Sequence, residues 1–334
     1  MRPFEYVSPK TLPQAVELLS GSWGETEILA GGTDLISLLK DDIVTPRRLV
    51  NIKEIKELGY VRYDQKSGLR LGALVTIQEI LDDPGIRVDY PAIAEAAEGI
   101  LSPQVRSTGT LGGELCQRPR CWYFRNGFGL LALGKNGTST VVDGDNRYHA
   151  ILGNSGPAYF VSPSILAPPL LALGASVQVV GPKGKREIGI GQFFRIPTTK
   201  GEREFNLKPG EIVTEVTVPP PDGALSATYE IRERQVLGWP LATASVNIKI
   251  RSKKVRWARV VLGHVAPIPW DSPEAAETLQ GEKVDTALAE SSGGNAVKHA
   301  VDLGRNGYKI HLASVAVKRA VLQATRRERH ENRV

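Results

Sequence analysis

The chain opens with short apolar runs that are followed by glycines and then by an amphipathic run. Residues 27–40, EILAGGTDLISLLK, show this order most clearly. The pattern predicts a strand, a tight turn at Gly31 and Gly32, and a helix that Thr33 or Asp34 can cap. Successive N–H groups at such a turn form a concavity suited to a phosphate or diphosphate. An ordinary strand-to-helix turn would give the same pattern.

A second glycine-rich stretch lies at residues 105–115, VRSTGTLGGEL. It is dense in backbone donors, hydroxyls and positions without a Cβ atom, and we predict a loop here. The two glycine loops could face each other across one diphosphate. Neither matches G-x-G-x-x-G with an acidic residue downstream, or G-x-x-x-x-G-K-S/T, so the Rossmann and P-loop interpretations are weak.

Elsewhere the chain mixes the strand period of two with the helical period of 3.6, which predicts an α+β protein. The patterns predict strands at residues 1–7, 48–52, 69–73, 176–180, 186–190, 211–218, 229–233, 242–250 and 255–263, and helices at 11–19, 91–97, 166–174, 273–279, 283–290 and 309–325. Residues 116–151 have little periodicity and predict a long irregular segment. Three prolines and a glycine at 219–223 are typical of a linker.

Several segments, taken in order, are similar to one known family. They are ILAGGTDL at 28–35, LGALVTIQEI at 71–80, RSTGTLGGEL at 106–115, SPSILAPPLLALGA at 162–175, LKPGEIVTEVTVP at 207–219, LGHVAPIPW at 262–270 and NGYKIHLASVAVKRAVL at 306–322. Together they resemble the FAD-binding (medium) subunit of the molybdenum hydroxylases, the group of xanthine dehydrogenase, aldehyde oxidoreductase and carbon monoxide dehydrogenase. The resemblance covers nearly the whole chain, which makes it far more specific than either glycine loop.

The resemblance implies a fold and a role. The fold is a two-part α+β FAD-binding domain of the vanillyl-alcohol oxidase (PCMH) type over residues 1–219, with an irregular insertion at about 116–160. A linker at 220–227 and a small α+β domain at 228–334 follow. The implied role is electron transfer. A large molybdenum-cofactor subunit oxidises the substrate, a small [2Fe–2S] subunit relays electrons to FAD, and an external acceptor receives them. No side chain of this chain is then catalytic.

The resemblance also implies which residues contact FAD, with the diphosphate held by backbone N–H groups at 30–34 and 107–113. The expected cofactor-binding residues are Leu29, Ala30, Gly31, Gly32, Thr33, Asp34, Leu35, Ser107, Thr108, Gly109, Leu111, Gly112, Gly113, Glu114, Ile165 and Leu166. Two of them depart from the family pattern. Glu114 replaces the usual Asn, and Ile165 replaces an acidic residue that binds the adenosine end. A flavin-free structural subunit of the same complex is therefore the alternative, and a stand-alone flavin oxidase is a third.

The stretch CQRPRCWYFR, which contains Cys116 and Cys121, resembles the corresponding stretch in the subgroup whose insertion carries an extra [4Fe–4S] cluster. A cluster needs about four thiolates, and the chain has 2 cysteines. Only Cys121 falls on a family ligand position, while the others lie within 127–142 and at Ala158. We therefore expect no [4Fe–4S] cluster and no protein-bound metal.

The remaining polar candidates lie in or beside this insertion. Among the histidines, His149 is the first candidate for a functional role. Arg118, Arg120 and Arg125 are expected to anchor the insertion or to contact a partner subunit.

Composition limits the other function classes. The formal charge is +6 and the pI is about 9.2, but the basic residues are scattered and their one dense cluster, at 325–334, is interrupted by acids, so we expect no nucleic-acid partner. No apolar run approaches the roughly 18 residues of a membrane span. The absence of a signal-like N-terminus and the low cysteine content favour a cytoplasmic protein.

Overall fold

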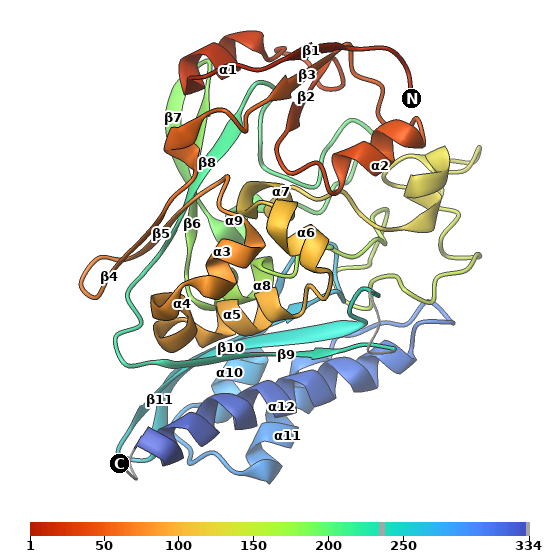
Figure 1. The fold of residues 1–334 in the computed structure, drawn as a ribbon. Helices are drawn as coiled ribbons and strands as arrows, with labels where there is room; N and C mark the ends of the chain where they lie inside the picture. The colour runs from red at the N-terminus through yellow and green to blue at the C-terminus, as the bar shows by residue number, and fades with distance from the viewer. Residues whose placement is uncertain (234–237, 332–334) are drawn as a thin grey trace.

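The structure is a computed structural model that describes residues 1–233 and 238–331, with side chains as far as Arg326. Three β-sheets follow one another down the molecule, separated and flanked by helices (Figure 1). The predicted α+β fold class is confirmed. Parts of two sequence features, the C-terminal domain at 228–334 and the basic cluster at 325–334, lie outside the described residues.

The first sheet is small and parallel, in the order β1-β3-β2. Its strands are β1 (Glu5–Val7), β2 (Thr26–Leu29) and β3 (Arg48–Asn51), and its helices are α1 (Leu12–Leu18) and α2 (Leu35–Lys40). Thr11 caps α1 by accepting from the N–H of Gln14. The strand–turn–helix unit predicted at 27–40 is therefore present, because its signals are local ones.

The second sheet is antiparallel, in the order β4-β5-β8-β6-β7, and forms the largest core with the helices beside it. Its strands are β4 (Val61–Asp64), β5 (Gly68–Gly72), β6 (Ser176–Gly181), β7 (Gly184–Gly189) and β8 (Ile212–Val218). The helical segments between the first two sheets and around this core are η1 (Lys56–Leu58), α3 (Ile77–Asp82), α4 (Pro84–Asp89), α5 (Pro91–Glu98), α6 (Pro103–Thr108), α7 (Leu111–Leu115), α8 (Ala167–Ala172) and α9 (Ile190–Phe193). A capping box formed by Thr76 and Glu79 begins α3.

The third sheet, also antiparallel, has the order β12-β11-β10-β9. Its strands are β9 (Leu225–Ile231), β10 (Ala242–Arg251), β11 (Lys254–Gly263) and β12 (Trp270–Asp271), and the helices after them are α10 (Pro273–Leu279), α11 (Thr286–Ala296) and α12 (Tyr308–Glu331). The long helix α12 packs against β9 and β10, and α5 contacts β9 through the hydroxyl of Thr228, which donates to the carbonyl of Ala92. This contact joins the core of the second sheet to that of the third sheet.

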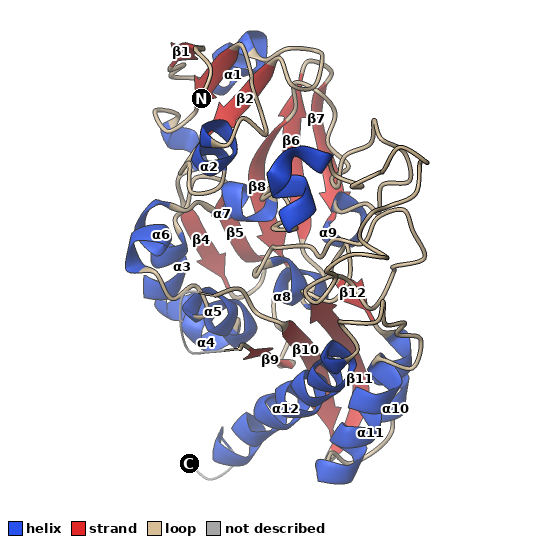
Figure 2. Cartoon of the chain, turned by 90° about the vertical axis from the view of Figure 1, so that its right-hand side faces the viewer, coloured by secondary structure: helices blue, strands red, loops and turns tan. Residues whose placement is uncertain are grey.

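The insertion forms a layer of loops at one side of the molecule, yellow to yellow-green in Figure 1 and mostly tan in Figure 2. Its one helical element within 116–160 is the short segment η2 (Phe124–Phe128). Hydrogen bonds of polar side chains connect parts of the insertion to one another and to the C-terminal region. The indole of Trp122 donates to the carbonyl of Asp145, and the amide of Asn306 donates to the carbonyls of His149 and Ala150.

Two local predictions from the sequence are wrong. The second glycine-rich stretch is not a loop but the end of α6 and the whole of α7, joined at Gly109 and Thr110. Ser102 and Thr110 cap these helices by accepting backbone N–H groups, so Gly112 and Gly113 sit inside a helical turn. Strand β9 spans Leu225–Ile231, whereas a strand is predicted at 229–233, because β9 pairs with β10 along this length. The domain boundaries themselves stay predictions.

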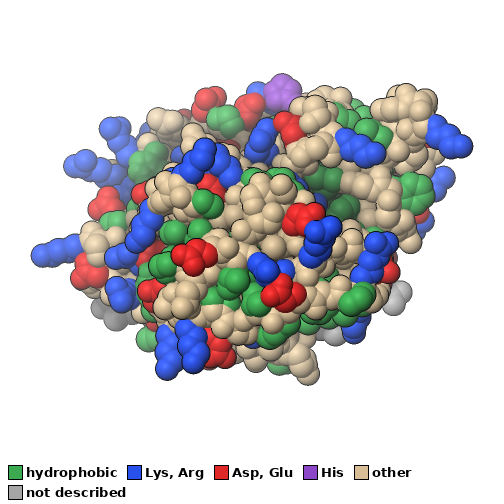
Figure 3. Space-filling view, turned by 90° about the horizontal axis from the view of Figure 1, so that it is seen from above, with side chains coloured by type: hydrophobic (Ala, Val, Ile, Leu, Met, Phe, Trp, Pro, Cys, Tyr) green, Lys and Arg blue, Asp and Glu red, His purple; other side chains and the backbone are tan. Residues whose placement is uncertain are grey.

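The charged side chains on the surface are mixed in sign (Figure 3). Side chains of both signs interleave over the face in Figure 3, without one continuous basic patch on that face. Among the described residues no helix combines the length and the apolar character needed to cross a bilayer.

Candidate functional site

The first glycine loop, residues 30–34, presents a run of free backbone donors. The N–H groups of residues 31–35 make no hydrogen bond to any described residue. Gly32 has a φ of 73°, which lets the chain reverse between β2 and α2. Asp34 occupies the N-cap position of α2, but its carboxylate makes no capping bond. Such a run of successive free N–H groups is a nest that accepts an anion.

The second glycine segment, residues 107–113, packs directly against this loop. A Cβ atom on Gly31 would overlap the carbonyl group of Thr108 and would lie 3.1 Å from the Cα atom of Gly109. The two segments therefore touch through their backbones, and only glycine fits at position 31. The two glycine segments, expected to face each other across a diphosphate, are thus in direct backbone contact.

The two segments differ in their hydrogen bonding. In the second segment the N–H groups of Gly109, Leu111 and Gly112 donate to backbone carbonyls, and that of Gly113 donates to the hydroxyl of Thr110. The resemblance implied that both segments hold a diphosphate through N–H groups. In this structure the first segment supplies the free donors, and the second supplies close backbone approach.

Cavities open on both sides of the contact. Cavity A, about 190 Å³, is lined by the first loop, by Gly112 and Gly113, and by residues 203–213 in part. Cavity B, about 270 Å³, is lined by Gly109, Glu114, Ile165 and Trp239 among others. Thr33 and Thr110 line both. A molecule with two bulky halves and a diphosphate between them could therefore cross the contact with one half in each cavity.

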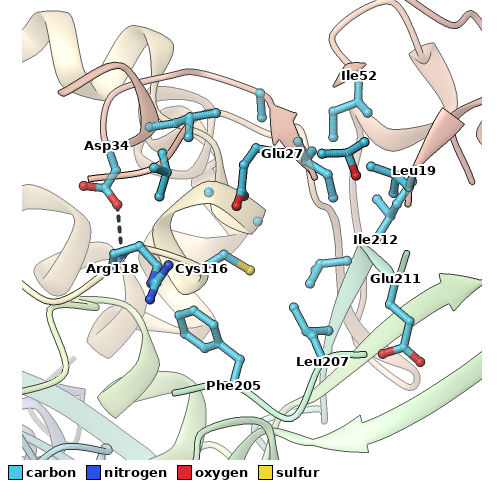
Figure 4. A pocket seen from close by; sticks show the side chains of 18 of the residues that line it. Leu19, Glu27, Asp34, Ile52, Cys116, Arg118, Phe205, Leu207, Glu211 and Ile212 are labelled. Atoms are coloured by element: carbon cyan, nitrogen blue, oxygen red, sulfur yellow. Dashed lines mark hydrogen bonds between the residues drawn. The ribbon is translucent and has the colours of Figure 1, made fainter. Parts of the chain in front are cut away.

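Asp34 organises the charged side of cavity A. It accepts from the backbone N–H of Arg118 at 2.8 Å, and its carboxylate pairs with Arg125 at 2.7 Å and with Arg120 at 3.1 Å. Arg118 pairs with the buried Glu204. Figure 4 shows Asp34 and Arg118 across cavity A from Leu19 and Glu211. The three arginines of the insertion thus anchor it to the first glycine loop.

Sequence reasoning missed a cation at this site. Arg203 lines cavity A, pairs with Glu27 at 3.5 Å, and lies over the ring of Trp23 at 4.6 Å from the ring centre. Burial is the main cause that lowers the pKa of the Arg203 guanidinium, and the positive charge of the nearby Arg118 lowers it further. No motif marks Arg203, because the loop that carries it is distant in sequence from the glycines. Arg118 and Arg203 thus line cavity A as guanidinium donors, each paired with a carboxylate.

Glu114, the departure from the family pattern, faces away from the first glycine loop. Its carboxylate accepts from the hydroxyl of Ser164 at 2.7 Å and from the N–H groups of Ile165 and Leu166 at 2.5 and 3.3 Å. Burial raises its pKa to about 7, although these hydrogen bonds act in the opposite direction. Glu114 therefore ties α7 to the segment that begins α8. Its carboxylate does not point at the free N–H groups.

The expected cofactor residues fall into three groups. Those that line cavity A or B are Ala30, Gly31, Gly32, Thr33, Asp34, Leu35, Gly109, Gly112, Gly113, Glu114 and Ile165. Leu29, Leu111 and Leu166 are buried in the core. Ser107 and Thr108 are exposed, and their hydroxyls donate to carbonyls of their own helix. The structure thus brings most of the predicted residues around one contact.

In the insertion, Cys121 lies beside Leu131 and Ala158, which fall in the regions where the family pattern has ligands of a [4Fe–4S] cluster. The side chain of Cys121 packs against a small apolar cluster formed by Leu131, Ala158 and Phe160. On another side its Sγ lies 3.1 Å from Nε2 of His149. Apolar side chains thus pack around Cys121 and around Ala158, a position where the family pattern has a cluster ligand. Within the described residues no group of three or more His, Cys, Asp or Glu side chains could hold a metal ion.

Comparisons with known proteins agree with this architecture. Residues 2–221 match the model of the FAD binding domain in molybdopterin dehydrogenase, and residues 227–324 match that of the CO dehydrogenase flavoprotein C-terminal domain. The aldehyde oxidoreductase FAD-binding subunit PaoB of Escherichia coli K12 is 31% identical over 87% of this chain and 91% of its own. The carbon monoxide dehydrogenase medium chain of Afipia carboxidovorans is 26% identical over 98% of both chains.

Solved structures show the same fold. A chain of quinoline 2-oxidoreductase from Pseudomonas putida 86 superposes with a TM-score of 0.75 at 21% identity, covering 97% of this chain and 98% of the other. A chain of carbon monoxide dehydrogenase from Hydrogenophaga pseudoflava gives 0.75 at 24% identity, covering 98% of each. The chain therefore belongs to the molybdopterin dehydrogenase FAD-binding domain family, as a medium, FAD-type subunit with the CO dehydrogenase flavoprotein C-terminal domain.

Proposed function

We propose that this chain is the FAD-binding, electron-transferring subunit of a heteromeric molybdenum-containing oxidoreductase. The observation that carries the proposal is the run of free N–H groups at residues 31–35, which lies where the two glycine segments touch and where cavities A and B meet. This arrangement fits the diphosphate of a dinucleotide with its two halves on opposite sides of the contact.

The chain's own groups have distinct tasks. The N–H groups of residues 31–35 donate to the diphosphate, while Arg118 and Arg203 offer guanidinium groups on the wall of cavity A. Gly31 allows the close backbone contact, and the remaining expected residues form the walls. When bound, FAD supplies the redox chemistry by accepting and releasing electrons, and the protein supplies position, exclusion of water and tuning of the potential.

The partners follow from the family. Relatives are named as the medium chain or the FAD subunit of oxidoreductases. We infer that a large molybdenum-cofactor subunit oxidises the organic substrate and that a small [2Fe–2S] subunit delivers electrons to this chain, which passes them to an external acceptor. No catalytic acid or base for the organic substrate is then needed in this chain.

A flavin-free structural subunit is the second candidate. It is favoured by the second glycine segment, whose N–H groups at 109 and 111–113 are bonded within the described residues, and by Ile165, an apolar side chain on the wall of cavity B. Such a subunit would keep the docking faces of the fold without the cofactor.

Purification of the native complex through a tag on this chain separates the two candidates. We expect equimolar FAD after acid release, together with molybdenum and with iron on partner subunits. The flavin absorbance should be bleached when the complex is reduced by its substrate. A complex that contains molybdenum but no flavin, even after incubation with FAD, would reject electron transfer through this chain and support the structural role.

A further inference from the structure

A third cavity, cavity C, lies between the insertion and the C-terminal region. Its volume is about 440 Å³, within the range of roughly 300–1,000 Å³ that is usual for small-molecule sites. Aromatic side chains form much of its wall, namely Trp122, Tyr148, Phe160 and Trp239. Arg120 and Trp239 line both cavity B and cavity C, and the guanidinium of Arg120 lies over the Trp239 ring at 4.5 Å.

Three buried nitrogen atoms on this wall make no hydrogen bond of ordinary geometry with a described residue. They are Nδ1 of His149, Nε2 of His264 and Nε of Arg120. The backbone of Asn146 and of Pro163 comes near the two imidazoles, so Nε of Arg120 is the donor that most clearly lacks a partner among the described residues. Native structures usually supply a buried donor with a partner such as water or a ligand.

The wall also carries a positive charge without a carboxylate partner. The buried Nζ of Lys309 donates to the carbonyls of Tyr148, His149 and His264, at 3.1, 3.2 and 2.7 Å. Burial lowers the pKa of Lys309 to about 7. A ligand carboxylate beside it would favour the ammonium form, which is the only form with three N–H donors for the three carbonyls. No carboxylate among the described residues lies within salt-bridge distance of Lys309, whereas Arg120 and Arg232 are paired with Asp34 and Glu230.

The other charged group on the wall is Glu233. It is exposed, and its carboxylate accepts from the hydroxyl of Tyr148 at 3.2 Å. The interior of the cavity therefore keeps the uncompensated charge of Lys309. This charge also contributes to lowering the pKa of both histidines, after burial, to about 4 for His149 and about 3 for His264. Both rings are then neutral at pH 7, and each can offer an N–H donor.

We propose that cavity C binds a small aromatic carboxylate. The aromatic ring of the ligand packs against the indole and phenyl walls, and its carboxylate accepts from Arg120 Nε and from an imidazole N–H near the Lys309 charge. Cavity C adjoins cavity B, with which it shares Arg120, Gly238 and Trp239, but no residue of the two glycine segments lines it.

The test begins with matched ligands on the full-length chain or its native complex, measured by isothermal titration calorimetry. The probes are 2-naphthoate and 2-naphthamide, which share the ring and one carbonyl but differ in charge. We expect 2-naphthoate to bind at least tenfold more tightly, because only the anion is attracted to Lys309. Equal affinities, tighter binding of the amide, or no binding of either probe would overturn the proposal.

A pair of tryptophan variants locates the site. Val161 lines cavity C, and Val161→Trp fills it. Val142 lies in the same insertion, is 41% exposed and does not line the cavity, so Val142→Trp is the matched control. We expect at least tenfold weaker binding of 2-naphthoate in the first variant and no change in the second. Unchanged binding by a folded Val161→Trp would place the ligand elsewhere and reject cavity C.

Trp239→Ala provides a second variant in case Val161→Trp does not fold. Trp239 is 39% exposed, so its removal leaves the core intact while it takes away one wall of the cavity. We expect binding of 2-naphthoate to weaken at least threefold, because a stacking partner is lost. Unchanged affinity in this variant would also reject the site.

Discussion

The glycine-segment contact and the insertion differ in the groups that they offer to a ligand: backbone groups at the contact and side chains in the insertion. At the contact, backbone atoms do most of the work: free N–H groups at 31–35 and a Gly31 that has no room for a Cβ atom. In the insertion, side chains do it: arginines that meet Asp34, and aromatic rings and histidines around cavity C. A backbone-built site leaves a sequence motif, whereas a side-chain-built site depends on long-range packing.

The largest effect is expected from Gly31→Ala. The added Cβ would overlap the Thr108 carbonyl, and the two segments would have to separate. We expect the FAD content of the purified complex to fall more than tenfold, measured as flavin released by acid. Gly189→Ala is the matched control, because a Cβ there meets nothing within 4 Å and its φ is not positive. Full FAD occupancy in Gly31→Ala would show that the contact does not position the cofactor.

Asp34→Asn tests how the insertion is held. The carboxylate is 12% exposed and pairs with Arg120 and Arg125. Removing one partner of a largely buried pair costs about 3 kcal/mol, and we expect that loss in the free energy of unfolding by urea. Asp145→Asn is the control within the insertion. Asp145 pairs with the half-exposed Arg147 at the surface, so this substitution should cost much less than Asp34→Asn. Equal losses in the two variants would contradict the anchoring role.

Glu114→Gln should change the dependence of stability on pH. Burial raises the pKa of Glu114 from its ordinary 4.5 to about 7, so its contribution to stability is present below pH 4.5 and is lost as the pH rises through 7. The loss is on the order of 3 kcal/mol. His149 and His264 act in the opposite direction, because their lowered pKa values remove stability below pH 6.5.

The difference between wild type and Glu114→Gln isolates the carboxyl group, since the histidines are common to both. Urea unfolding at several pH values between 5 and 8 gives that difference. We expect the free energy of unfolding of the variant to increase relative to that of the wild type as the pH rises. Parallel curves would mean that the Glu114 carboxyl has its ordinary pKa in the folded protein.

The smallest effect is expected from Cys121→Ala. The thiol packs against Leu131 and Ala158, so its loss should cost about 1 kcal/mol, comparable to one buried methylene group. The iron content of the purified chain should not change. Cys116→Ala is the matched control, because this second half-buried thiol packs against the core of the second sheet and not against Leu131 and Ala158. Loss of iron in Cys121→Ala alone would reveal a cluster held by this cysteine.

Local signals account for what could be predicted from the sequence. The strand–turn–helix unit at 27–40 and the strands at 176–180 and 186–190 rest on patterns within a few residues. The glycine density of the second glycine-rich stretch predicts a loop, whereas Ser102 and Thr110 cap two short helices there. Caps are local as well, so this signal was available.

The sequence by itself determined the family, the α+β class and the first glycine loop, because these depend on residue types in a fixed order. Only the tertiary structure decided that Gly31 touches Thr108, that Asp34 collects arginines from 84 or more positions away, and that Glu114 faces Ser164. It also placed Lys309 among carbonyls of the insertion. The physical reason is that a backbone nest is encoded by adjacent residues, whereas a buried charge finds its partners only when distant segments pack together.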